Sequence, residues 1–159
     1  MKILAEKAHN LKYSEFSSRQ LKSIIELSKY LKKKYKIKNN CFLGHSDISP
    51  DRKIDPGEKF PWEKLSKNKI GIWPNLKKKN LLLLRGKKLA EKEKLLFFKM
   101  IAKFGYMMSS NRFKKIDTYQ RRLCKVFQMR FRKELVNGKI DKECLLILKK
   151  LLFSNQINS

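Results

Sequence analysis

Apolar residues recur at helical spacing in four stretches of the chain: 17–36, 88–104, 118–132 and 141–153. The first stretch opens with Ser17 and Gln20, the pair that forms a capping box at a helix start. The second stretch ends at Gly105, a residue suited to the position after a helix. We therefore predict one long helix near the N-terminus and three further helices, packed as a bundle, from residue 81 to residue 155.

A different pattern separates these helices. Residues 41–44, CFLG, form a short apolar run that is typical of a buried strand. Prolines and a glycine exclude regular structure over residues 50–57, and residues 74–80 resemble a linker. The predicted fold is thus an α/β half-domain in residues 1–76, followed by an all-α three-helix bundle in residues 77–159. Trp62, Ile72 and Trp73 are expected to pack beneath the loop.

The chain is strongly basic, with 40 Lys and Arg against 14 Asp and Glu and a net charge of +26. Such a charge favours an anionic partner, for example nucleic acid, a membrane surface or an acidic cell-wall polymer. The cations are mainly lysines spread along the whole chain, which also fits a compositional bias and disfavours a dedicated nucleic-acid reader. No apolar run is long enough to span a membrane. Three cysteines without metal-type spacing indicate small buried thiols.

Residues 44–57, GHSDISPDRKIDPG, contain unusually dense polar chemistry. His45 and Asp55 carry the imidazole nitrogen and carboxylate oxygen that zinc accepts, and the prolines and glycine could fold the loop back between them. Lys53 stands two residues before Asp55, so in an extended segment both side chains point the same way. A metal that activates water, beside an ammonium that stabilises an oxyanion, suits amide hydrolysis. From these residues alone, a surface loop with an Asx turn is the favoured interpretation, and zinc is the alternative.

This string resembles the second zinc-binding segment of the zinc-dependent N-acetylmuramoyl-L-alanine amidases of type 2, which are related to peptidoglycan recognition proteins. The following FPWEKL and GIWP are similar to that family as well. The resemblance implies that His45 and Asp55 are zinc ligands and that Lys53 contacts the substrate or transition state. It further implies peptidoglycan or muropeptides as partners, and a loop-shaping role for four residues: Asp47, Arg52, Pro56 and Gly57.

The C-terminal part resembles the small helical domain of two-domain bacterial amidases. Its VFQMRFRKELVNGKID is similar to a signature of three-helix peptidoglycan-binding domains. In the family, a second histidine ligand and a glutamate that moves the water's proton lie in an earlier segment. His9, Glu6 and Glu15 do not match that segment, and we expect all three to be surface residues.

A catalytic zinc normally has three protein ligands. We therefore expect a C-terminal amidase fragment that is inactive alone and is completed by an upstream-encoded N-terminal amidase fragment. The compartment depends on this partner: cytoplasmic if Met1 is the true start, and the cell envelope if an exported half precedes it. The alternatives are a non-catalytic cell-wall-binding module and a basic nucleic-acid-binding protein.

Overall fold

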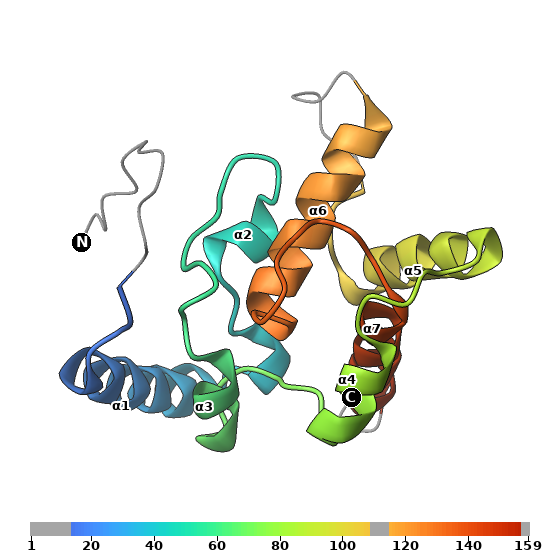
Figure 1. The fold of residues 1–159 in the computed structure, drawn as a ribbon. Helices are drawn as coiled ribbons and strands as arrows, with labels where there is room; N and C mark the ends of the chain where they lie inside the picture. Colours follow the sequence, from blue (N-terminus) through green and yellow to red (C-terminus); the bar gives the residue numbers. More distant parts are fainter. Residues whose placement is uncertain (1–13, 109–114, 157–159) are drawn as a thin grey trace.

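The computed structural model describes residues 14–108 and 115–156, and these residues are helical with no β-strand. Figure 1 shows α1 and α3 on one side of the molecule, α5 and α7 on the other, and α6 beside α2 between them. The elements, in chain order, are α1 (Ser18–Tyr35), the 3₁₀ turn η1 (Asn39–Cys41), α2 (His45–Ile48), α3 (Trp62–Lys67), α4 (Lys78–Leu84), α5 (Glu91–Phe104), α6 (Ile116–Phe131) and α7 (Lys142–Gln156).

The expected α/β half-domain is wrong for the described residues. Residues 39–41 form the turn η1, and Phe42 and Gly44 have extended backbone angles, but no described segment lies beside them in a ladder. A strand exists only where a neighbour accepts and donates its backbone hydrogen bonds. The apolar run at 41–44 therefore stays extended without becoming a strand, and the chemistry that follows it is carried by a helical turn.

Helix α1 begins as the sequence predicts. Ser17 accepts a hydrogen bond from the backbone of Gln20 at 3.2 Å, and the Gln20 side chain accepts one from the Ser17 backbone at 2.8 Å, which completes the capping box. The apolar face of α1 packs through Leu21 onto Leu65 and Ile70. This small cluster, the first core, supports the base of the loop that carries the polar motif.

The three predicted C-terminal helices all form, as α5, α6 and α7, and they share a second and larger core. Phe97 of α5 packs edge-on against Phe127 of α6, with ring centroids 5.6 Å apart. A fourth helix joins them, because the guanidinium of Arg85, directly after α4, donates to both carboxylate oxygens of Glu143 at 2.8 and 2.7 Å. The expected linker over 74–80 is too long, since α4 already begins at residue 78.

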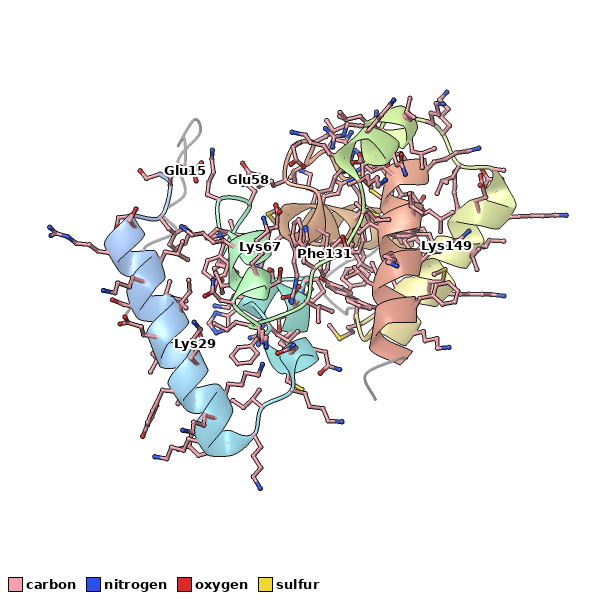
Figure 2. The ribbon with its side chains drawn as sticks, turned by 90° about the horizontal axis from the view of Figure 1, so that it is seen from below. Glu15, Lys29, Glu58, Lys67, Phe131 and Lys149 are labelled. Atoms are coloured by element: carbon pink, nitrogen blue, oxygen red, sulfur yellow. The ribbon has the colours of Figure 1, made fainter. Side chains whose placement is uncertain are left out.

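The two cores are in contact through the middle of the chain. Trp62 is buried, and Ile72 and Trp73 pack against the larger core rather than only beneath the loop. Phe131 at the end of α6 lies in the interior between the two groups of helices (Figure 2). The division into residues 1–76 and 77–159 stays a prediction.

The basic residues are dispersed over the surface. Lys29, Lys67 and Lys149, labelled in Figure 2, are all exposed and belong to three different helices, α1, α3 and α7. This dispersal favours compositional bias over a dedicated nucleic-acid surface. In the part of the chain that the structure describes, no helix combines the length and apolar character needed to cross a membrane.

Candidate metal site in the loop after residue 44

The structure brings His45 and Asp55 together at the surface. His45 is the first residue of α2, and Asp55 precedes Pro56 in a cis peptide bond. The Nδ1 atom of His45 lies 2.5 Å from the Oδ2 atom of Asp55. Their side chains are 74% and 49% exposed, so the pair is open to solvent and to a ligand.

The chemistry of this pair fits a metal ion such as zinc. A tetrahedral zinc with bonds of about 2.0–2.2 Å holds two ligand atoms about 3.4 Å apart. The two atoms are now 2.5 Å apart. They would therefore have to move apart by less than about 1 Å to admit the ion. Within the described residues, no group of three His, Cys, Asp or Glu side chains could hold a metal. A zinc ion held by this pair would therefore need at least one further ligand.

The other residues considered as ligands lie elsewhere. Glu15 is an exposed surface residue, as expected, and its carboxylate accepts a hydrogen bond from Lys59 at 2.8 Å. Hydrogen bonding to Lys59 and its positive charge lower the pKa of Glu15. Glu6 and His9 lie outside the described residues.

The loop closes on itself because of three local features. The backbone N–H of Ser46 donates to the carbonyl of Asp55 at 3.0 Å, which joins the two ends. Gly44 is needed because a Cβ there would lie 2.6 Å from the Cδ atom of Pro56. Gly57 has a φ of 81°, in the left-handed region that favours glycine. Pro56 and Gly57 thus lie where the loop turns back on itself, and their loop-shaping role stays a prediction.

Arg52 and Lys53 occupy the outer part of the loop. Their backbone N–H groups both donate to the carbonyl of Ser49, at 3.2 and 3.0 Å, which turns the chain back toward Asp55. Both side chains are exposed. The side chain of Lys53 is therefore accessible to a ligand from solvent.

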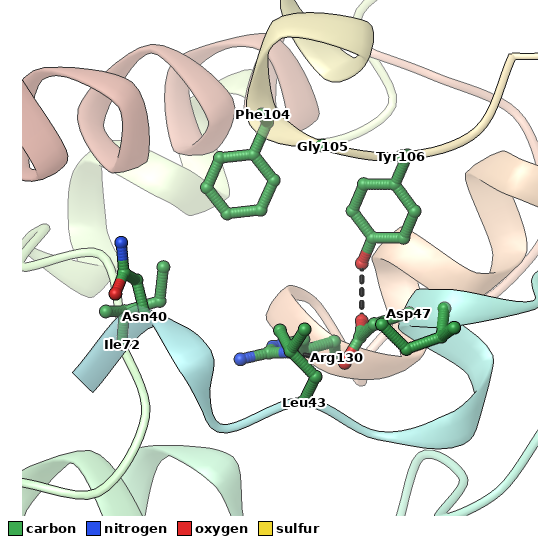
Figure 3. A pocket seen from close by; sticks show the side chains of 9 residues that line it. Asn40, Leu43, Asp47, Ile72, Phe104, Gly105, Tyr106 and Arg130 are labelled. Carbon is green, nitrogen blue, oxygen red and sulfur yellow. Dashed lines mark hydrogen bonds and ion pairs between the residues drawn. The ribbon is translucent and has the colours of Figure 1, made fainter. Parts of the chain in front are cut away.

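Asp47, in contrast, points into the protein. Its carboxylate accepts hydrogen bonds from the backbone of Gly44 at 2.7 Å, from the hydroxyl of Tyr106 at 2.6 Å, and from Arg130 of α6. Figure 3 shows this group at one wall of a hollow of about 150 Å³. Burial, and then the negative charge of Asp47, raise the pKa of the Tyr106 hydroxyl well above its usual value. The hollow lies between the loop and the helical tail, because Asp47 lines it from one side and Tyr106 and Arg130 line it from the other.

Two arginines of α6 hold the loop, and neither was identified from the sequence. Arg130 donates to the carbonyl of Phe42 at 3.0 Å and lies 4.1 Å from the ring centroid of Trp62. Arg122 donates to the carbonyls of Pro50 and Lys53 at 2.8 and 2.9 Å. The contacts join residues between 69 and 88 positions apart. Local sequence patterns do not predict contacts between residues so far apart in the sequence. The only sequence feature that sets these two residues apart is that arginine is scarce among many lysines.

Comparison with known proteins agrees with the resemblance in the loop. The model of the N-acetylmuramoyl-L-alanine amidase family matches residues 2–58. The chain is 33% identical to the N-acetylmuramoyl-L-alanine amidase AmiD of Escherichia coli over 148 residues, which are 92% of this chain and 52% of AmiD. It is 48% identical over 50 residues to the 1,6-anhydro-N-acetylmuramyl-L-alanine amidase AmpD of Haemophilus influenzae, covering 31% of this chain and 27% of AmpD.

Solved structures give the same picture. AmiD from E. coli, in complex with the substrate anhydro-N-acetylmuramic acid-L-Ala-D-γ-Glu-L-Lys, is similar with a TM-score of 0.75 and 34% identity, covering 88% of this chain and 53% of AmiD. AmpDh3 from Pseudomonas aeruginosa, in complex with an anhydromuramic pentapeptide, is similar with a TM-score of 0.74 and 28% identity, covering 91% of this chain and 56% of AmpDh3.

These comparisons confirm that the chain is related to the AmiD-like N-acetylmuramoyl-L-alanine amidases over most of its length. Its relatives are hydrolases that act on peptidoglycan, and the matching family is in general zinc-dependent. The chain spans about half the length of AmiD.

Proposed function

We propose that this chain supplies part of the zinc site, and a substrate-contacting lysine, of an N-acetylmuramoyl-L-alanine amidase. The observation that supports the proposal most directly is the contact between His45 Nδ1 and Asp55 Oδ2, which face each other at the surface of the loop that matches the family. The substrate is peptidoglycan or a muropeptide, by analogy with the ligand in the solved AmiD complex. The bond cleaved is the amide between N-acetylmuramic acid and L-alanine.

The residues of this chain have distinct tasks in the proposal. His45 and Asp55 would hold zinc through an imidazole nitrogen and a carboxylate oxygen. When bound, the metal supplies an activated water and polarises the scissile carbonyl. Lys53 brings a positive charge to the side of the site where the amide oxygen becomes an oxyanion. Its backbone is turned toward the pair by the hydrogen bond to Ser49.

Two components come from elsewhere in this proposal. The third zinc ligand is a histidine, and the general base is a glutamate that takes a proton from the water and passes it to the leaving amine. In the proposal both belong to a separate N-terminal amidase fragment. Alone, the 159-residue chain is expected to bind zinc weakly and to release no muropeptides.

Zinc binding is the first test, and the chain contains its own control, because it has only two histidines. We expect His45→Ala to abolish zinc binding in competition with a chromophoric chelator, whereas His9→Ala leaves the dissociation constant unchanged. Loss of binding in His9→Ala would show that His9 is itself a ligand. Equal binding by the wild type and His45→Ala would contradict the proposal.

Activity is tested by reassembly. The part of E. coli AmiD that this chain does not match is fused ahead of the chain, and soluble muropeptides released from purified peptidoglycan are measured. We expect zinc-dependent release, lost in His45→Ala. Lys53→Met is expected to keep zinc but to reduce turnover by about 10²-fold, as for loss of one oxyanion-stabilising group.

A second candidate function, a cell-wall-binding module, is favoured by a separate feature of the helical tail. A hollow of about 380 Å³ lies between α5, α6 and the turn before α7. Phe98 and Ile140 line it together with charged side chains, among them Lys88, Lys94, Lys139 and Asp117. Apolar and cationic side chains around one hollow suit the carboxylates of peptidoglycan stem peptides. This role is compatible with the amidase proposal and could also operate alone.

A further inference from the structure

The two arginines of α6 hold opposite halves of the loop that carries His45 and Asp55. Arg122 and Arg130 are eight residues apart on one helix, which places their Cα atoms about 12 Å apart along its axis. Arg122 bonds to two backbone carbonyls of the loop, and Arg130 bonds to the carbonyl of Phe42, two residues before the loop, and to the side chain of Asp47 within it. Contacts of this kind fix where the loop backbone lies, independently of the side chains that project from it.

Arg130 holds the first half of the loop. Its guanidinium donates to the Phe42 carbonyl at 3.0 Å and to the Asp47 carboxylate, which in turn accepts the Gly44 N–H at 2.7 Å. Gly44 is the N-cap of α2, and His45 is the first residue of this helix. Arg130 and Asp47 are both buried, with side chains 4% and 5% exposed. The helical turn that presents His45 is therefore fixed on both sides by one buried guanidinium.

Arg122 holds the second half. Its Nε donates to Pro50 and its Nη2 to Lys53, at 2.8 and 2.9 Å, so one planar guanidinium spans the outer turn of the loop. Burial lowers the pKa of Arg122, the charge of Asp51 opposes this effect, and the guanidinium stays protonated at neutral pH. Arg122 is only half-buried. It can consequently be replaced without opening the core.

We propose that Arg122 and Arg130 are positioning residues for the metal-binding loop, so that α6 of the tail is part of the site's framework. The proposal rests on the amidase function proposed above. A loop that is ordered before the metal arrives loses less conformational entropy when it binds, and residues that support metal ligands from behind commonly alter metal affinity by about 10-fold or more. Neither arginine touches the metal, the substrate or a reacting atom in this arrangement.

The test compares two neighbouring arginines on the same helix. Arg122→Met removes the contacts to the loop, and Arg121→Met removes an exposed arginine that has no contact with it. In the full chain, NMR signals of the His45 imidazole are followed while Zn²⁺ is added, with His9→Gln used for assignment. We expect Arg122→Met to raise the zinc dissociation constant about 10-fold, and Arg121→Met to leave it unchanged, with similar melting temperatures for both.

A second measurement does not depend on zinc. The amides of Ser46 and Lys53 are hydrogen-bonded within the loop, to Asp55 and Ser49. We expect both to exchange with solvent at least about 10-fold faster in Arg122→Met than in Arg121→Met, because the loop opens locally once its support is lost. Arg122→Lys is expected to restore part of the protection, since one ammonium reaches one carbonyl at a time.

The outcomes separate the two proposals. If zinc leaves the His45 signals of the wild type unchanged, the amidase site is wrong, and the exchange rates alone decide whether Arg122 positions the loop. If zinc binds equally to Arg122→Met and Arg121→Met, or if their exchange rates are equal, the positioning role is overturned. Arg130→Lys extends the test to the first half of the loop, with the same expected loss of zinc affinity.

Discussion

Asp47→Asn tests how strongly the loop and the tail depend on each other. The substitution keeps the size of the side chain and removes its negative charge. In the folded protein that charge faces Arg130, and both side chains are almost fully buried. The matched control is Asp55→Asn, the same change eight residues away in the same loop, where the carboxylate is 49% exposed and contacts His45.

The expected magnitudes differ because the two carboxylates have different surroundings. Removing one partner of a buried ion pair leaves the other charge uncompensated, which costs about 3–5 kcal/mol. Gly44 and Tyr106 donate to different oxygens of Asp47, and Asn has only one acceptor oxygen, so the substitution removes one of these hydrogen bonds as well as the charge. An exposed pair contributes less than about 1 kcal/mol, so Asp55→Asn should change the free energy of unfolding little. For a chain of this size, about 3–5 kcal/mol lowers Tm by roughly 6–20 °C.

The assay is urea and thermal unfolding followed by circular dichroism, with a chelator present so that metal binding does not contribute. Zinc affinity should show the opposite ranking, with the larger loss in Asp55→Asn. A double-mutant cycle with Arg130→Met isolates the pair, and the double variant should lose clearly less than the sum of the single variants. If the free energies of unfolding of Asp47→Asn and Asp55→Asn differ by less than about 1 kcal/mol, the conclusion that the ion pair joins the loop and the tail is refuted.

Two further predictions concern other parts of the molecule. Burial raises the pKa of the Cys124 and Cys144 thiols to about 12, whereas Cys41 is exposed. At pH 8 a disulfide reagent should therefore react rapidly only with Cys41 in the folded protein, and with all three thiols after denaturation. Rapid reaction of three thiols in the folded protein would contradict the core assigned to α6 and α7. If the tail recognises peptidoglycan, the chain should sediment with insoluble cell wall at physiological salt and stay bound at moderately higher salt, whereas loss at that step would indicate simple attraction by lysines.

The local parts of the fold could be predicted from the sequence. The start of α1 follows from Ser17 and Gln20, which satisfy each other's backbone groups without help from the rest of the chain. Helices α5 to α7 follow from apolar spacing, because each buries one face in the common core. Their ends differ from the predicted ones by up to three residues.

The non-local parts could not be predicted in this way. A strand at 41–44 was expected from composition, but strand formation depends on a partner that the run itself does not specify. The same limit applies to Arg122 and Arg130, because three helices separate Arg122 from Pro50 in the sequence and four separate Arg130 from Phe42. Asp47 was placed in a loop-shaping role only by the resemblance. The structure gives that placement a physical basis, since its carboxylate accepts three hydrogen bonds.

The polar and charged residues of the segment 44–57 fall into two sets with different physical roles. Asp47 faces inward and is tied to the tail, so folding explains it. His45, Lys53 and Asp55 face solvent, and an exposed contact such as the one between His45 and Asp55 stabilises a protein little. Folding therefore does not account for an imidazole, a carboxylate and an ammonium gathered on one exposed loop. A ligand that needs all three chemistries does account for them, which is why the outward set supports the proposed zinc site and the inward set supports the framework that holds it.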